Sequence, residues 1–203
     1  MAQRRRQLKA PPASPPVVAS RLLPEVFAGF EEGESITVLD FGPGSASTVT
    51  YLSRFRAKVI FADLIDNPEL RNPPEDADMA TLADLISDQM SVPPGLHIDV
   101  CLMWDYLHYL DVHVIEALSS VLQPMIRPTT RGYGFGALHS RDPMQGNRYG
   151  ISGPEELTSA PLTNEEPYTP HSQQWLGEHM LALRISRGTL LMEGRLELLF
   201  EAP

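Results

Sequence analysis

The chain has 203 residues, of which 42% are hydrophobic, and a formal net charge of -10 at pH 7. This length suits a single domain, and no apolar run approaches the ~20 residues that span a bilayer, so a membrane-spanning role is excluded. Arg4, Arg5, Arg6 and Lys9 are four of the 16 basic residues, so the rest of the chain carries 12 basic and 26 acidic residues, a charge of -14 that disfavours nucleic acid as a partner.

The N-terminal segment is rich in proline and arginine. Residues 1–16 are predicted to form a disordered leader, and residues 17–203 a single domain. Apolar spacing after the leader indicates either a broken helix or a helix that begins near Leu23, with Pro24 in its first turn. The one cysteine, Cys101, lies in an apolar run and forms no intrachain disulfide, which is typical of a cytoplasmic protein.

A strand, a glycine turn, a helix and a second strand follow in order. Residues 36–41 form a short β-branched and apolar run that predicts a strand buried on both faces of a parallel sheet. Gly42 and Gly44 follow it, residues 47–55 have helical spacing, and residues 58–62 are predicted to form a second buried strand, which ends at Asp63. The pattern is that of a βαβ unit.

The remaining pattern alternates helices and strands. Residues 140–172 hold many glycines and prolines and are expected to be irregular. The predicted elements are helices at 79–90, 111–122 and 172–180, strands at 98–103 and 132–138, and a C-terminal antiparallel hairpin of 183–192 and 195–201. The fold class is therefore α/β, with a mostly parallel sheet, helices on both faces and an antiparallel hairpin at its edge.

The glycine turn predicts a ligand site. Glycine permits a tight turn and close approach of the backbone to a ligand, and the helix that follows offers free N–H groups. An acid at the end of the next strand, here Asp63, suits a ribose diol. A dinucleotide fingerprint is incomplete because Ser47 stands at its third glycine, and no lysine follows to form a P-loop. A tight turn without a ligand is the alternative interpretation.

Two segments resemble class I S-adenosylmethionine-dependent methyltransferases. VLDFGPGSA at 38–46 is similar to their first motif, with Ala46 in place of the third glycine, and IDVCLMWDYLHYLD at 98–111 is similar to the fourth-strand motif of ubiquinone-biosynthesis-type members. The resemblance implies a Rossmann-like methyltransferase fold that binds S-adenosylmethionine. It places Asp40 near the methionine part of the cofactor, Gly42 and Gly44 beneath it, and Asp63 on the ribose.

The chain departs from that family at two points. No clear strand lies between the second strand and the strand at 98–103, so the acid near the adenine is not fixed, and Asp76, Asp78 and Asp88 remain as alternatives. Pro43 removes one backbone donor from the glycine turn.

Candidate reactive residues follow the strand at 98–103, because ligands bind at the carboxyl ends of parallel strands. Trp104 is predicted to form a wall of the cofactor site, and Asp105 and His108 are the catalytic candidates, with packing or capping roles as the alternatives. Tyr106 and Tyr109 lie in the same segment, and His139 follows the next strand. The histidines have no metal-ligand spacing, so no metal site is expected.

We therefore expect a cytoplasmic methyltransferase that acts on a small molecule or a protein side chain, with the segment 140–172 over the acceptor. A protein partner is possible; nucleic acid and membrane are not expected. A catalytically inactive methyltransferase-like domain that serves as a binding or scaffold subunit is the main alternative, and a nicotinamide-dependent oxidoreductase is a more distant one.

Overall fold

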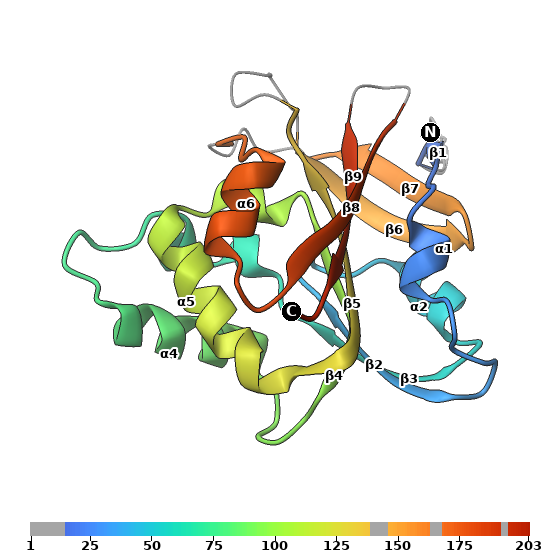
Figure 1. Cartoon of the computed structure of the whole chain (residues 1–203), viewed down its shortest axis with the longest axis horizontal. Coiled ribbons are helices and arrows are strands. Elements are labelled where there is room, and N and C mark those ends of the chain that lie inside the picture. The colour runs from blue at the N-terminus through green and yellow to red at the C-terminus, as the bar shows by residue number, and fades with distance from the viewer. Residues whose placement is uncertain (1–14, 139–145, 163–167, 192–194) are drawn as a thin grey trace, which may run out of the picture.

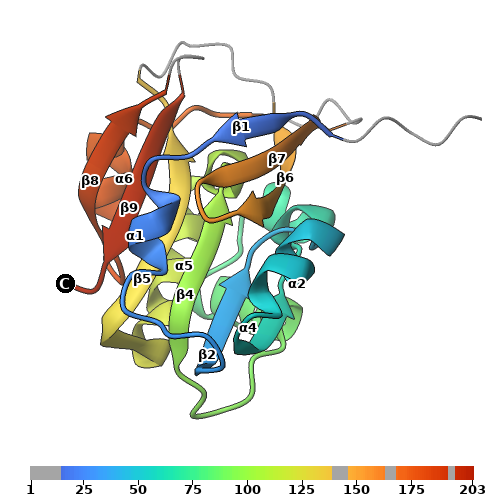
Figure 2. The ribbon, with the colours of Figure 1, turned by 90° about the vertical axis from the view of Figure 1, so that its right-hand side faces the viewer.

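The computed structural model describes residues 15–138, 146–162, 168–191 and 195–203. Most of the predicted leader and His139 lie outside these residues. Figures 1 and 2 show one large central sheet with helices on both faces, and a smaller sheet above one end of it.

The central sheet has six strands in the order β3-β2-β4-β5-β9-β8. Strands β3, β2, β4 and β5 are parallel to one another. Strand β9 runs antiparallel to both of its neighbours, β5 and β8, and forms the predicted C-terminal hairpin with β8. The bounds are β2 Ser35–Asp40, β3 Arg56–Phe61, β4 Ile98–Trp104, β5 Ile126–Gly136, β8 Arg184–Leu190 and β9 Leu196–Glu201. The α/β class with a mostly parallel sheet and a closing hairpin is confirmed.

The edge of this sheet at β3 differs from the sequence expectation. The expected strand is present, but its residues are exposed or half-buried, because no further strand pairs with its outer side. Within residues 64–97, all of which are described, the chain forms helices and no strand. No further strand therefore extends the sheet beyond β3, in agreement with the sequence, which shows no clear strand in this segment.

Helices cover both faces of the sheet. In Figure 1, α4, α5 and α6 lie on one side and α1 and α2 on the other. The bounds are α1 Leu23–Val26, α2 Ala46–Leu52, α3 Pro68–Arg71, α4 Met79–Met90, α5 Val112–Leu122 and α6 Gln173–His179, with 3-10 turns η1 Leu64–Asp66, η2 Tyr106–Tyr109 and η3 Gln123–Met125. Asp78, Asp111 and Ser172 cap α4, α5 and α6 by accepting a backbone N–H with the side chain, which explains why these helices begin where they do.

A second sheet of three strands was not expected. Its order is β1-β7-β6, with bounds β1 Val17–Ala19, β6 Asn147–Gly153 and β7 Glu156–Pro161. The prediction of irregular structure over 140–172 is therefore wrong for β6 and β7, and the helical interpretation of the segment after residue 17 is wrong for β1. Figure 2 shows this sheet above the carboxyl ends of β2 and β4.

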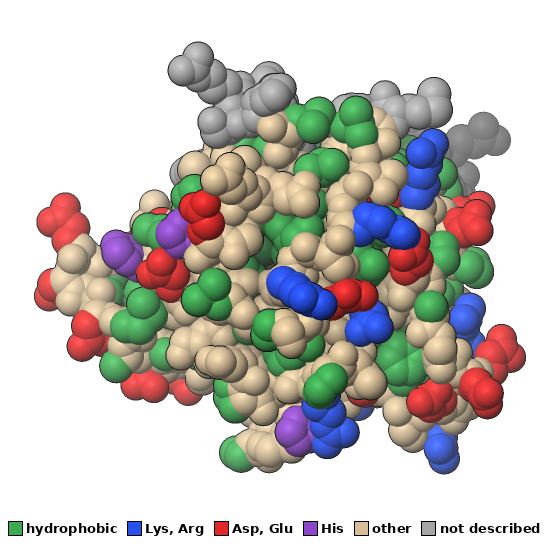
Figure 3. Space-filling view, in the orientation of Figure 1, with side chains coloured by type: hydrophobic (Ala, Val, Ile, Leu, Met, Phe, Trp, Pro, Cys, Tyr) green, Lys and Arg blue, Asp and Glu red, His purple; other side chains and the backbone are tan. Residues whose placement is uncertain are grey.

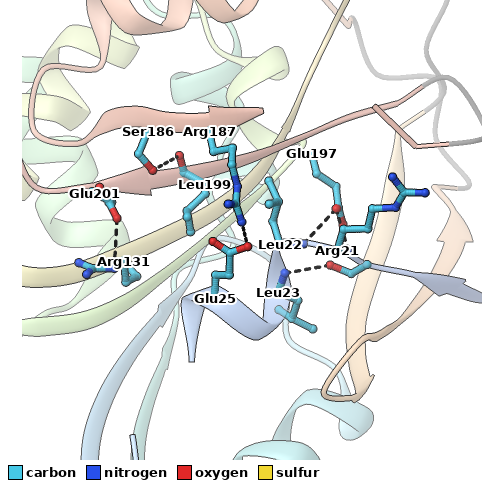
Figure 4. A network of polar contacts seen from close by, with 11 residues as sticks. Arg21, Leu22, Leu23, Glu25, Arg131, Ser186, Arg187, Glu197, Leu199 and Glu201 are labelled. Carbon is cyan, nitrogen blue, oxygen red and sulfur yellow. Dashed lines mark hydrogen bonds and ion pairs between the residues drawn. The ribbon is translucent and has the colours of Figure 1, made fainter. Parts of the chain in front are cut away.

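Glu197 joins the N-terminal segment to the central sheet. Its buried carboxylate accepts hydrogen bonds from the amides of Arg21 (2.9 Å) and Leu22 (3.2 Å) and from the Tyr133 hydroxyl (2.5 Å). Figure 4 shows the amide contacts beside an ion pair between Glu25 of α1 and Arg187 of β8. These contacts hold α1 against β8 and β9. The helix begins at Leu23, as predicted, but it has only one turn.

The surface is acidic on the side of α4. No lysine or arginine occurs between Arg71 and Arg127 in the sequence, and Figure 3 shows acidic side chains along that rim, whereas acidic and basic side chains are interspersed over β8 and β9. A surface of this kind repels polyanions. Among the described residues, no helix has the length and apolar character to cross a membrane.

Candidate functional site

The site lies where the strand order reverses. From β2 the chain passes to β3 on one side and then to β4 on the other, so the carboxyl ends of β2 and β4 flank a topological switch point. Open α/β sheets bind ligands at this position. The predicted residues Asp40, Gly42, Trp104 and Asp105 all lie at these two strand ends.

Asp40 determines the shape of the turn after β2. Its Oδ1 atom accepts hydrogen bonds from the Gly42 amide (2.9 Å) and from the indole Nε1 of Trp104 (2.7 Å). Burial, only partly offset by these bonds, raises the pKa of Asp40 from 3.8 to about 6. The carboxylate therefore ties the glycine turn to the end of β4.

Aromatic side chains cover both glycines closely. A Cβ atom on Gly42 would lie 2.7 Å from Cε2 and 2.8 Å from the hydroxyl oxygen of Tyr106, and one on Gly44 would lie 2.8 Å from the Phe61 ring. Gly44 also has a φ of +81°, a conformation that side chains disfavour. The folded chain itself thus favours glycine at both positions, at Gly44 through its backbone conformation and at Gly42 through the Tyr106 ring, whether or not a ligand binds.

Asp63 lies at the same edge of the sheet, directly after β3. Burial and the neighbouring Asp66 raise the pKa of Asp63, while Arg148 of β6 lowers it. The negative charge of Asp63 in turn raises the pKa values of Asp40 and of the Tyr106 hydroxyl. We call the space between the Gly42–Gly44 turn and Asp63 the cradle.

Tyr106 occupies the cradle. It belongs to η2, is 2% exposed, and lies against Gly42. Burial is the main reason that the pKa of its hydroxyl is raised, and Asp105, Asp40 and Asp63 add to the effect. An aromatic ring therefore lies among the three acids where the sequence predicts a nucleoside.

Trp104 faces the small sheet as well as Asp40. Its backbone has a φ of +52°, which is unusual for a residue with a bulky side chain. The indole stacks on the Tyr149 ring of β6, with ring centroids 5.4 Å apart and planes inclined by 12°. Trp104 thus joins the turn after β2 to the small sheet.

Asp105 is buried beneath β6. Its Oδ2 atom accepts hydrogen bonds from the Tyr149 hydroxyl (3.0 Å) and the Asn147 amide (3.2 Å), and the Arg195 guanidinium donates to the same hydroxyl. Its Oδ1 atom has no hydrogen-bond partner among the described residues. Burial raises the pKa of Asp105 from 3.8 to about 7, against the opposing effects of these bonds and of Arg195.

His108 has both ring nitrogens engaged. Nδ1 accepts from the His171 amide (2.9 Å), so Nε2 carries the proton and donates to the Phe135 carbonyl oxygen (3.0 Å). The side chain is fully buried, and burial lowers the pKa of His108 from 6.5 to about 3. In this arrangement the ring is a structural link between η2 and the chain near His171, with no free nitrogen to act as a base.

The small sheet covers the start of α2. Gly150 of β6 packs so tightly on this end that a Cβ atom there would lie 2.3 Å from the hydroxyl oxygens of Ser45 and Ser47. Ser45 caps the helix through the Thr48 amide, and Thr48 Oγ1 accepts from the Ile151 amide (3.1 Å). Ala46, predicted to be near the cofactor, is exposed.

A cavity of about 660 Å³ lies beside the site, between α3, α5 and α6. Tyr109 of η2 and Asp111 contribute to its lining, together with His171 and Trp175, whose rings stack with centroids 3.9 Å apart. The turn after β2 and Asp63 do not line it. No group of three metal-binding side chains is found in the described part of the chain.

Sequence reasoning missed the contributions of β6 and of the C-terminal hairpin. Tyr149, Asn147 and Arg195 lie far from the strand motifs in sequence, inside or beside segments without a regular pattern. The alternation of Asn147, Tyr149 and Ile151 on one side of a strand is a weak signal that was available.

No protein-family model and no curated protein matches the chain. Among solved structures, it is similar to Burkholderia thailandensis 1,6-didemethyltoxoflavin-N1-methyltransferase, solved with its substrate and S-adenosylhomocysteine (14% identity, 90% of this chain and 77% of that chain, TM-score 0.48). It is also similar to an S-adenosylmethionine-dependent methyltransferase from Clostridium acetobutylicum (10%, 84% and 85%, TM-score 0.47) and to Streptomyces venezuelae DesVI (13%, 90% and 89%, TM-score 0.49). These identities and scores are low, so the fold assignment rests on the strand order itself: a Rossmann-like α/β sheet closed by an antiparallel hairpin.

Proposed function

We propose that the chain is a cytoplasmic S-adenosylmethionine-dependent methyltransferase that acts on a small molecule or a protein side chain. One observation carries this proposal: a glycine turn, a buried acid and a second acid gather at the switch point between β2 and β4. Asp40, Gly42 and Asp63 are of the types that the resemblance requires. The solved structures of similar fold include methyltransferases with S-adenosylhomocysteine bound.

The space at this site does not accommodate the cofactor in the conformation described. The residue types suit a nucleoside, but the Tyr106 ring fills the cradle beside Gly42. Because protein interiors are close-packed, the Tyr106 ring and the cofactor cannot occupy this space at the same time. Cofactor binding therefore requires the ring to leave, and we derive no chemical step through the cofactor.

Asp105 is the side chain best placed to accept a proton from a methyl acceptor. It follows β4 directly, its Oδ1 atom has no hydrogen-bond partner among the described residues, and its pKa of about 7 suits proton transfer near neutral pH. Methyl transfer depends mainly on positioning, so such a base is needed only for an acceptor that must lose its proton early. An acceptor could reach Asp105 only if β6 moves aside, because Tyr149 and Asn147 of that strand donate directly to its Oδ2 atom.

Isothermal titration with S-adenosylhomocysteine tests the proposal. We expect binding by the wild type at high micromolar ligand and its loss in Asp63→Ala. Asp84→Ala is the matched control, because Asp84 is an exposed acid on α4 that does not act on Asp63 and should leave binding unchanged. Absence of binding in the wild type and in every variant with an opened cradle would refute the proposal.

A non-catalytic binding or scaffold subunit is the second candidate. The filled cradle favours it, and so does the exposed outer edge of β3, where no strand follows to complete an adenine site. A domain of this kind would bind no S-adenosylhomocysteine even after Tyr106 is shortened, and this outcome separates the two candidates.

A further inference from the structure

Tyr106 is held in the cradle by packing. Its ring lies against Gly42, and the Tyr109 ring is 6.5 Å away between ring centroids. Within the described part of the chain, its hydroxyl group forms no hydrogen bond. Asp40, Asp63 and Asp105 nevertheless lie near enough to raise the pKa of this hydroxyl. Among the described residues, the ring is therefore held by packing and not by a hydrogen bond at its hydroxyl group.

The position of the ring follows from the end of β4. The left-handed backbone of Trp104 turns the chain sharply, so that the indole reaches Asp40 while Tyr106, two residues later, returns over the glycine turn. Both aromatic side chains thus approach the same turn from one strand end. A side chain in this position blocks the close approach of any ligand to the amides beside Gly42.

We infer that Tyr106 competes with the cofactor for the cradle, so that the ring must leave before S-adenosylmethionine binds. This inference rests on the proposed function. The apparent affinity of a site is reduced by the fraction of molecules in which it is open. Burial of an aromatic ring favours the buried position by roughly 10- to 100-fold, so the wild-type affinity is expected to be lowered by the same factor.

The test compares S-adenosylhomocysteine binding by the wild type, Tyr106→Ala and Tyr106→Phe in calorimetric titrations of the full chain. We expect Tyr106→Ala to bind at least ~10-fold more tightly than the wild type, because the cradle is then open in every molecule. Tyr106→Phe keeps the ring and should bind like the wild type. Tyr51→Ala, which shortens a buried tyrosine on α2 that packs on Phe27, controls for general loosening and should give no gain.

Each result has a distinct meaning. If the wild type binds and Tyr106→Ala binds no more tightly, the competition is refuted while the proposed function stands. If neither binds, both are refuted. A gain in Tyr106→Phe equal to that in Tyr106→Ala would also contradict competition by the ring, because only the hydroxyl is removed there.

A second measurement uses the wild type alone, in case the alanine variant does not fold. A crystal structure with S-adenosylhomocysteine should show the ligand at the turn and the Tyr106 ring away from Gly42. A ligand seated between Gly42 and Asp63 with the ring still against Gly42 would overturn the inference.

Discussion

The buried carboxyl of Asp105 should make the stability of the protein depend on pH. In the unfolded chain this group loses its proton near pH 3.8, whereas in the folded chain its pKa is about 7. Between these values the folded state binds one proton more than the unfolded state, so the free energy of unfolding falls as pH rises. The shift is roughly three pKa units, and each unit corresponds to ~1.36 kcal/mol, so ionisation of this one group should remove about 4 kcal/mol from the free energy of unfolding between pH 4 and pH 7.

Asp105→Asn removes this dependence, because an amide does not titrate. The variant loses part of the hydrogen bonding to Tyr149 and Asn147, and this cost is nearly independent of pH. Urea unfolding of both proteins at several pH values between 4 and 8 gives the difference in their free energies of unfolding. That difference should move in favour of the variant by about 4 kcal/mol as pH rises. A difference that stays constant across the range would show that Asp105 is already ionised and hydrated, and the reasoning from burial would be wrong.

Three further predictions concern stability. Glu197→Ala removes the acceptor of three hydrogen bonds and should lower the free energy of unfolding by about 3 kcal/mol, or the melting temperature by about 6–12 °C. Glu201→Ala removes a partly exposed ion pair with Arg131 and should cost less than about 1 kcal/mol. Equal losses in the two variants would contradict the role of Glu197. Gly42→Ala should cost about 1–3 kcal/mol by contact with Tyr106, and much of this cost should vanish in a Tyr106→Ala background; additive effects in a double-mutant cycle would exclude that contact. The pKa of His108 is lowered to about 3, so its stabilising effect is present above pH 6.5 and is lost on acidification. The difference in free energy of unfolding between the wild type and His108→Asn should therefore shrink by roughly 3 kcal/mol from pH 7 to pH 4. A difference that does not change with pH in denaturant unfolding would argue that the ring is solvated.

The central sheet could be predicted because its strands are local signals. The run 36–41 and its partner at 58–62 are β-branched and apolar, and glycine marks the turn between them. Such patterns are the spacing and the continuity of apolar residues, and both can be recognised in the sequence. Even the capping residues Asp78 and Asp111 directly precede the helices that they cap.

The small sheet could not be predicted, because its pairing is non-local. Val17 pairs with Thr158, and no local pattern indicates that partner. Gly146, Gly150 and Gly153 read as loop residues, yet Gly150 is where β6 packs on the start of α2. A glycine required for close contact cannot be distinguished in sequence from one required for a turn.

The sequence predicted which strand ends meet at the candidate site, but not that a side chain lies there, and the roles of the site residues stay predictions. The positions of Asp40, Gly42 and Asp63 follow from the strand ends, and the structure places them together. The residue types do not suggest that Trp104 adopts a left-handed backbone or that the Tyr106 ring lies against Gly42. Similarly, the engagement of both His108 nitrogens depends on backbone atoms of distant segments.

The pairing of β1 with β7 also has a consequence for the order in which the protein can assemble as it is made. β1 is made before its partner, which lies about 140 residues further along the chain. At roughly 5–20 residues per second, the first strand waits on the order of 10 s before it can pair. During that interval β1 has no strand with which to pair, and the small sheet over the carboxyl ends of β2 and β4 can form only after β7 has been made.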